Sequence, residues 1–153
     1  MEALADLPGA WLRGSVPSYA LVNAGHILGL GLLVGAIAAL DLRLLGAFRT
    51  VAVAPLAGML ERVAGAGLIL ALVTGLLLLS VRPAAYLANP AFLAKLALVA
   101  AGVLNAGFLR MSRDWRDMGG GAPVTRRMRL AAAASLVIWV SAVICGRWIA
   151  FVE

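Results

Sequence analysis

The stretch that decides the fold of this chain is Asn23–Gly46, NAGHILGLGLLVGAIAALDLRLLG. Every residue from Ile27 to Leu40 is apolar or glycine, so a helix over this stretch has no side that favours water. An apolar run of about 20 residues is what a helix needs to cross a hydrocarbon core of about 30 Å. The stretch therefore predicts a transmembrane helix, although it carries His26, the only histidine of the chain.

Composition extends this prediction to the whole chain. Of its 153 residues, 63% are hydrophobic and 13% are charged, whereas apolar residues make up about 45–50% of an ordinary soluble domain. The net charge of +6 comes mainly from arginines that flank apolar runs, which is typical of a membrane protein with basic loops and not of a nucleic-acid-binding domain. The single cysteine, Cys145, excludes an intrachain disulfide.

Three further apolar runs follow the first, and Pro55 separates the first two. Backbone amides in lipid must be satisfied within their own segment, so each run is predicted to be a helix. Residues 1–153 are thus predicted to be a single all-α transmembrane domain, an integral membrane four-helix bundle with helices near 19–40, 63–81, 92–109 and 130–149. A short interfacial helix is expected near 3–12, with Trp11 at the level of the headgroups.

The distribution of basic residues predicts the orientation of the bundle. One side carries nine of them: Arg43, Arg49, Arg62, Arg110, Arg113, Arg116, Arg126, Arg127 and Arg129. The opposite side carries four: Arg13, Arg82, Lys95 and Arg147. Because cytoplasmic loops are enriched in Lys and Arg, we expect both termini in the periplasm, in a multi-pass protein of the bacterial inner membrane.

Small residues spaced four apart predict where the helices pack, because transmembrane helices associate through close contact of small side chains. The first run contains two such pairs, Gly25 with Gly29 and Gly31 with Gly35. The second run contains a longer stripe of small residues three or four apart: Ala64, Gly67, Ala71 and Gly75.

Polar side chains gather near the outer ends of the predicted helices. His26 lies about 10 Å below the end of its helix, at 1.5 Å per residue. If the polar residues at that depth face the bundle interior, one layer contains Asn23, His26, Thr74, Lys95, Cys145 and Arg147. Polar groups are costly in lipid, so each of them needs a structural or functional reason.

Three interpretations of His26 remain open. In the first, a neutral imidazole bonds Ser141 or a backbone carbonyl, while Lys95 and Arg147 extend to the headgroups. In the second, His26 is a metal ligand, the axial imidazole of haem b, and the propionates pair with Lys95, Arg147 and Arg82. In the third, the histidine serves a proton or quinone site.

The haem interpretation lacks a second axial ligand within the chain. Methionine can serve in that role, but on the expected topology the internal methionines all lie on the cytoplasmic side: Met59, Met111, Met118 and Met128. A second copy of the chain then supplies the ligand, or the iron is five-coordinate, or no haem is bound.

A second polar set lies at the cytoplasmic ends of the helices. Asp41 is expected to pair with an arginine of the second or third helix and to fix that end of the bundle. Asn105, about one turn farther in, is expected to link two helices by a hydrogen bond. No GxSxG, P-loop or HExxH motif is present and no carboxylate lies at mid-membrane, so the sequence predicts neither an enzyme nor a carboxylate-based ion relay.

Three segments resemble a bacterial family of four-helix membrane proteins known as a domain of unknown function, family number 6644: GHILGLGLLVGAIAALDLRLLG, NPAFLAKLALVAAGVLNAGF and GRWIAFV. The resemblance spans about Val16–Val152 and implies a compact inner-membrane protein with His26 at the family's helix-one histidine. Members often carry histidine after the third-helix phenylalanine, where this chain has Leu109. A distant likeness to copper-resistance membrane proteins and cytochrome b-type subunits rests on four helices and one histidine.

The sequence leads to one functional hypothesis and two alternatives. We expect a small non-catalytic inner-membrane protein that binds haem b through His26 and serves electron transfer. The first alternative is a cofactor-free structural or interaction module that packs against a membrane partner subunit or a second copy of itself. The second is a small-molecule or ion carrier. The lipid bilayer is the expected partner in every case, and nucleic acid is not.

Overall fold

The computed structural model describes residues 7–151, which form helices and connecting turns and contain no strand. Four helices are long and apolar enough to cross a membrane: α3 (Val16–Leu45), α4 (Val53–Leu79), α6 (Pro90–Met111) and α8 (Arg126–Trp148). The predicted all-α fold with four membrane-spanning helices is therefore confirmed. Of the interfacial helix expected near 3–12, residues 3–6 lie outside the described residues, and the remainder falls in α2 (Leu7–Arg13).

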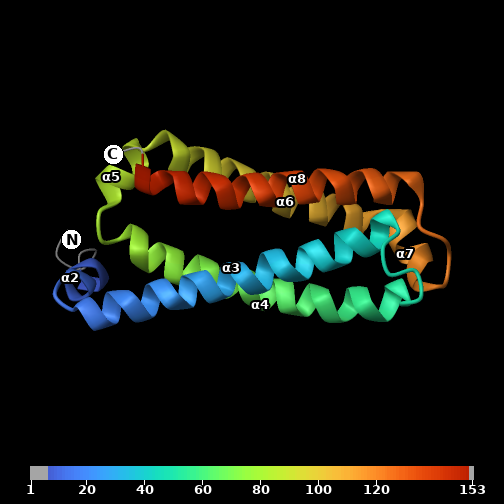
Figure 1. Cartoon of the computed structure of the whole chain (residues 1–153), viewed down its shortest axis with the longest axis horizontal. Helices are drawn as coiled ribbons and strands as arrows, with labels where there is room; N and C mark the ends of the chain where they lie inside the picture. Colours follow the sequence, from blue (N-terminus) through green and yellow to red (C-terminus); the bar gives the residue numbers. More distant parts are fainter. Residues whose placement is uncertain (1–6, 152–153) are drawn as a thin grey trace.

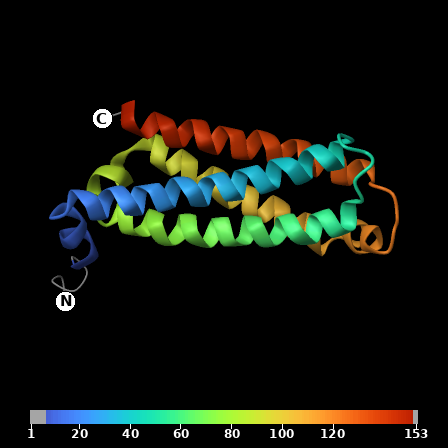
Figure 2. The same ribbon diagram turned by 60° about the horizontal axis from the view of Figure 1, so that its bottom comes forward.

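The long helices form two antiparallel pairs that lie one beside the other (Figure 1). In one pair α3 packs along α4, in the other α6 packs along α8, and contacts between α3 and α8 hold the pairs together. Both ends of the described chain lie at the same end of the bundle, beside α2 and α5 (Pro83–Ala88), which we call the terminal end (Figure 1). The turn 46–52 and α7 (Arg113–Gly119) form the opposite end, which we call the loop end (Figure 2).

Side-chain caps explain where three of the long helices begin. The hydroxyl of Ser15 accepts a hydrogen bond from the backbone N–H of Ser18 at the start of α3. Asn89 and Thr125 play the same part for α6 and α8. A cap of this kind satisfies a backbone N–H that has no partner within the helix.

The second long helix starts earlier than the sequence pattern indicated. α4 begins at Val53 and not near residue 63, so Pro55 lies in its first turn and not in a connection between helices. Proline is tolerated there because the first N–H groups of a helix have no carbonyl partner within the helix. The preceding helix ends at Leu45, and its C-cap Gly46 has a φ of 111°, in the left-handed region that favours glycine.

Glycine residues bring α3 and α4 into backbone contact. A Cβ atom added to Gly29 would lie 2.7 Å from the backbone nitrogen of Ala71, and one added to Gly67 would lie 2.6 Å from the backbone nitrogen of Leu33. This confirms the predicted packing role of these small residues. The prediction is wrong for Gly31 and Gly35, which are exposed and would carry a Cβ with nothing within 4 Å.

The α6–α8 pair is held by one close contact and one polar link. A Cβ atom on Gly102 would lie 2.8 Å from the indole ring of Trp139. One turn farther along, Nδ2 of Asn105 donates a hydrogen bond of 3.0 Å to the carbonyl oxygen of Ala131. The expected interhelical role of Asn105 is therefore confirmed.

In contrast, α4 and α6 do not pack closely against each other. They are bridged near the loop end by the ion pair between Arg110 Nη1 and Glu61 Oε2, 3.0 Å apart. The two helix pairs therefore diverge on this side, and the space between them is where both candidate sites lie.

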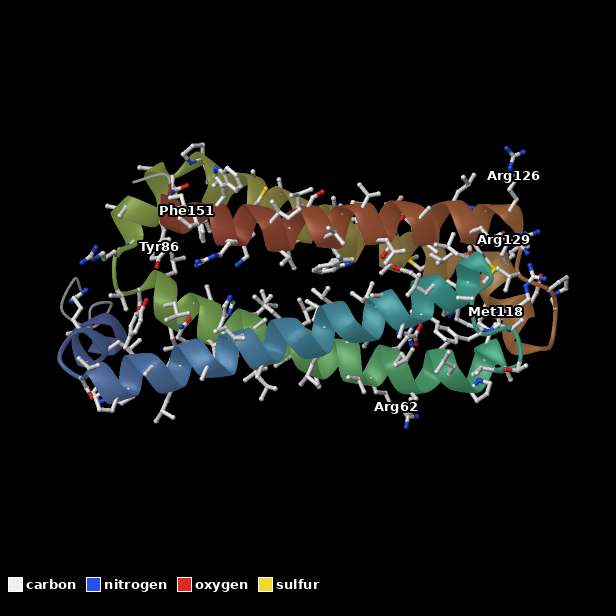
Figure 3. The ribbon with its side chains drawn as sticks, viewed as in Figure 1. Arg62, Tyr86, Met118, Arg126, Arg129 and Phe151 are labelled. Carbon is white, nitrogen blue, oxygen red and sulfur yellow. The ribbon has the colours of Figure 1, made fainter. Side chains whose placement is uncertain are left out.

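The loop end is closed by a compact apolar cluster. Its buried members come from α3, α4, α7 and α8: Leu44, Ala57, Met118, Met128 and Ala132. Figure 3 labels Met118 there, together with Arg126 and Arg129 at the start of α8. The short helix α7, which the sequence pattern did not predict, thus seals the bundle between its basic connections.

Candidate functional site

A cavity of about 1040 Å³ opens between the two helix pairs at the terminal end; we call it the outer cavity. Its walls are mainly apolar and come from α3, α4, α5, α6 and α8. Seven polar side chains also line it: Tyr19, Asn23, His26, Arg82, Tyr86, Asn89 and Lys95. Figure 3 labels Tyr86 at this end. Apolar walls with a few convergent polar groups are typical of sites for small molecules and cofactors.

His26 is held in one orientation by α4. Its Nδ1 lies 3.0 Å from the carbonyl oxygen of Ala71 and 3.2 Å from Oγ1 of Thr74. The Thr74 hydroxyl donates to the carbonyl oxygen of Leu70, 2.6 Å away. Because a carbonyl oxygen only accepts hydrogen bonds, Nδ1 is the donor in this pair, and in the neutral ring the lone pair is then on Nε2. Nε2 makes no hydrogen bond within residues 7–151.

A small residue makes room for this ring. A Cβ atom on Gly75 would lie 3.1 Å from Cε1 of His26, so a larger side chain there would push the imidazole away. Gly75 therefore has a second role besides the helix packing that its spacing predicted. The half-buried imidazole lies between the two helices of the first pair and still reaches the cavity wall.

Two cations share the cavity with His26. Lys95 packs its side chain against Gly146 of α8, and its charge is close enough to interact with the imidazole. Arg82 lies on the connection before α5. Neither forms an ion pair with an acid in the part of the chain that the structure describes. Within residues 7–151, the outer cavity therefore presents two cations without an acidic partner beside one imidazole.

A second, smaller cavity of about 320 Å³ lies nearer the loop end; we call it the inner cavity. Asp41 of α3 lines it and is only 5% exposed. The hydroxyl of Ser135 interacts with this carboxyl group. The indoles of Trp115 and Trp139 form part of the wall. Leu33 and Leu68 line both cavities, so the two spaces adjoin.

Residues 14–152 of the chain match the profile of a family described as a family of unknown function, DUF6644. The chain belongs to this family. No curated protein and no solved structure matches it. The DUF6644 membership and the four spanning helices together make it a membrane protein. The comparisons do not support the likeness to copper-resistance proteins or cytochrome b-type subunits.

In this DUF6644 protein the predicted outer polar layer is only partly assembled. Asn23, His26 and Lys95 share one cavity, and Thr74 bonds His26 from behind. Arg147 was expected there but does not line the cavity; its guanidinium lies 5.2 Å from the ring centroid of Phe151. Cys145 and Ser141, both half-buried, do not line it either, and His26 bonds a backbone carbonyl and not Ser141.

The predicted pairing of Asp41 with an arginine is wrong. The arginine of α6 that lies nearby, Arg110, pairs with Glu61 instead. Oδ2 of Asp41 has no hydrogen-bond partner, and neither has Nε1 of Trp139. No motif in the sequence singles out Trp139, although its position one turn after Ser135 places both residues on one face of α8. No group of three or more His, Cys, Asp or Glu side chains suited to a metal ion occurs within residues 7–151.

Proposed function

We propose that this protein is a small non-catalytic subunit of the bacterial inner membrane that binds haem b in the outer cavity through Nε2 of His26. The observation that carries this proposal is the contact of 3.0 Å between Nδ1 of His26 and the carbonyl oxygen of Ala71. The hydrogen bond from Nδ1 to the Ala71 carbonyl orients the ring and leaves the lone pair of Nε2 free. Imidazoles that bind metals commonly donate their second N–H to such a carbonyl, which fixes the ring and makes it a better ligand.

The charges of the outer cavity suit the carboxylates of haem. Lys95 and Arg82 line the same cavity as His26 and have no acidic partner among the described residues. A buried or half-buried cation is stabilised by a carboxylate that forms charge-assisted hydrogen bonds with it. Arg147 does not take part in this pairing, because it stacks on Phe151 and does not line the cavity.

The remaining walls suit the apolar part of a large flat ring. Leucine side chains from α3, α4 and α6 line the cavity, and its volume of about 1040 Å³ is at the upper end of the range for cofactor and ligand pockets. When bound, haem supplies one-electron redox chemistry. The part of this chain is then to orient the imidazole, pair the carboxylates and keep water from the ring.

The protein offers one axial ligand. His26 is the only imidazole of the chain, and no methionine or cysteine lines the outer cavity. We therefore propose a five-coordinate iron in the isolated subunit. Electron transfer through a six-coordinate, low-spin haem then needs a ligand from a partner subunit or from a second copy of this chain.

The test is the optical spectrum of the full chain, expressed with added haem precursor and purified in a mild detergent. We expect a Soret band of the high-spin type at about one haem per chain. His26→Ala should abolish the band, while Ser141→Ala, a matched change outside the cavity, should leave it unchanged. A colourless wild-type protein, or an unaltered band in His26→Ala, would show that His26 binds no haem and would favour the cofactor-free interaction module.

The orientation of the bundle is part of the proposal. The loop end carries nine of the thirteen Lys and Arg residues, and this asymmetry supports a cytoplasmic loop end with both termini in the periplasm. Single cysteines placed at Thr50 and at Ser15, in a Cys145→Ser background, test it with a membrane-impermeant thiol reagent. Labelling of the Ser15 position but not of the Thr50 position in intact spheroplasts is expected, and the opposite pattern reverses the orientation.

A small-molecule or ion carrier is the second candidate function. It is favoured by one observation, which is that the outer and inner cavities adjoin at Leu33 and Leu68. A solute path through the bundle would have to pass this apolar constriction. Solute flux into proteoliposomes that Leu33→Trp blocks would favour a carrier over a haem subunit.

A further inference from the structure

The inner cavity contains a carboxyl group that forms no ion pair within residues 7–151. Asp41 lies in a membrane-spanning helix, is 5% exposed, and its Oδ2 has no hydrogen-bond partner. Its neighbour Ser135 lies nine residues inside α8, which is about 13 Å from the start of that helix at 1.5 Å per residue. An ionisable group buried at this depth marks a functional site unless a partner satisfies it.

The cations near Asp41 are already engaged elsewhere. Arg110 lines the same cavity but pairs with Glu61 at 3.0 Å. Arg43, two residues along α3, donates to the carbonyl oxygens of Val51 and Arg49. The opposite charges of Glu61 and Arg110 balance each other. Of the residues that line the inner cavity, Asp41 is therefore the carboxylate left without a counter-charge from residues 7–151.

A second orphan group lies close to the first. Trp139 is 3% exposed, and its indole N–H has no acceptor. Trp139 follows Ser135 by one turn on the same face of α8, which separates the two positions by about 6 Å. The carboxyl group of Asp41 and the indole N–H of Trp139, both without a hydrogen-bond partner, therefore line the same cavity, and the indoles of Trp115 and Trp139 form part of its wall.

We propose that the inner cavity binds a small ammonium ion with an oxygen two carbons away, the chemistry of ethanolamine and of ethanolamine headgroups. The ammonium group would donate to Oδ2 of Asp41, and the oxygen would accept the N–H of Trp139. A carboxylate beside tryptophan rings is suited to an ammonium ion, because the ring face attracts a cation and the carboxylate balances its charge. The cavity volume of about 320 Å³ admits such an ion.

The ligand would enter between α4 and α6. These helices do not pack closely, and the ion pair of Glu61 and Arg110 spans the space between them. The side chain of Arg110 is 66% exposed, so this bridge lies at the edge of the cavity and not deep within it. This side faces the membrane and its headgroup region, where both free amino alcohols and phospholipid headgroups occur.

The experiment is a titration of the purified full chain in detergent, read out by tryptophan fluorescence and by calorimetry. Ethanolamine is expected to bind saturably. Propylamine has the same charge and length but no oxygen, and it should bind at least tenfold more weakly. Ethylene glycol has the oxygens but no charge and should not bind.

Two variants locate the binding at the orphan groups. Asp41→Asn keeps the shape of the side chain and should weaken ethanolamine binding at least tenfold. Trp139→Phe should abolish the preference for ethanolamine over propylamine, which tests the site even if Asp41→Asn does not fold. Ser141→Ala should leave the titration unchanged, because Ser141 lines neither cavity. The ammonium proposal does not rest on the haem proposal, because His26 does not line the inner cavity.

A comparison of two bilayers identifies the source of the ligand. In nanodiscs of phosphatidylethanolamine the apparent affinity for free ethanolamine should fall relative to phosphatidylglycerol nanodiscs if the headgroup is the natural occupant, and it should stay equal if the free amino alcohol is. Failure of ethanolamine to bind the wild type, equal affinity for ethanolamine and propylamine, or full binding by Asp41→Asn would each overturn the proposal.

Discussion

The interface of α3 with α4 and the gap between α4 and α6 are two faces of one helix, and they differ sharply. On the first face Gly67 lets the backbones touch, since a Cβ there would lie 2.6 Å from the nitrogen of Leu33. On the second face α4 does not pack closely against α6, the ion pair of Glu61 and Arg110 bridges the two helices, and two cavities lie in the space between. Both faces are apolar, so hydrophobicity does not explain the difference.

The positions of the small residues therefore decide which helices of this bundle pack closely against each other. Lipid competes for apolar side chains as well as a protein does, so helices in a membrane need close backbone approach or polar links to associate. Gly29 and Gly67 provide that approach between α3 and α4. Without an equivalent contact, α4 and α6 stay apart, and the polar residues that face the space between the pairs become candidate site residues.

The largest expected effect on stability comes from adding a methyl group to the interface between α3 and α4. Gly67→Ala should destabilise the protein by about 1–3 kcal/mol, because the new methyl group meets backbone atoms that cannot turn aside. Unfolding in mixed detergent micelles, followed by circular dichroism, measures this. Gly35→Ala is the matched control: it faces open space and should leave stability equal or raise it by up to about 1 kcal/mol. Equal stability of the two variants would contradict backbone contact between α3 and α4.

A smaller effect is expected in the second pair. A methyl group in Gly102→Ala would lie 2.8 Å from the indole of Trp139, a side chain that can shift, so we expect a loss of about 1 kcal/mol. The same change should alter the fluorescence of the protein, because the indole in the wall of the inner cavity moves. Gly107→Ala, with nothing within 4 Å, is the control for helix propensity. An unchanged emission spectrum in Gly102→Ala would argue against this contact.

The polar link of the α6–α8 pair should contribute less. Asn105→Ala removes the hydrogen bond to the Ala131 carbonyl, and interhelical hydrogen bonds in membranes contribute about 0.6 kcal/mol on average. The same unfolding experiment should show a loss of that order. A loss as large as that of Gly67→Ala would mean that polar links, and not close packing, dominate the stability of this bundle.

The smallest effect on stability is expected from breaking the ion pair between α4 and α6. Glu61→Gln breaks the ion pair with Arg110, whose side chain is 66% exposed, so the loss of stability should stay below about 1 kcal/mol. Hydrogen exchange in the α4 segment that lines the inner cavity should nevertheless increase, because the one bridge to α6 is lost. A large loss of stability would show that α4 and α6 are coupled more tightly than the contacts indicate.

Much of the fold could be predicted from the sequence. All four spanning helices were predicted, because the length of an apolar run is read directly from the chain. The predicted boundaries were short by a few residues at most ends and by ten at the start of α4 (Val53 instead of 63), where Pro55 was interpreted as a break. Proline in a first helical turn and proline in a loop look alike in a single sequence.

The candidate site was less predictable. The depth of His26, Thr74 and Lys95 follows from counting along each helix, and the structure does bring these three together. Arg147 has nearly the same depth, yet it turns to Phe151. Asp41 was expected to pair with an arginine, but the nearby Arg110 forms its ion pair with Glu61. Depth is set along the helix axis, whereas the facing of a side chain depends on the rotation of the helix about that axis.

By itself, the sequence determined that this protein has four apolar helices and that its basic connections gather at one end, because length, hydropathy and charge belong to each segment separately. Only the tertiary structure decided that His26 bonds α4 and keeps Nε2 free, and that Asp41 and Trp139 are left without partners. Those outcomes depend on how neighbouring helices pack and turn toward one another. That packing follows from contacts between segments far apart in the chain, such as Gly29 with Ala71.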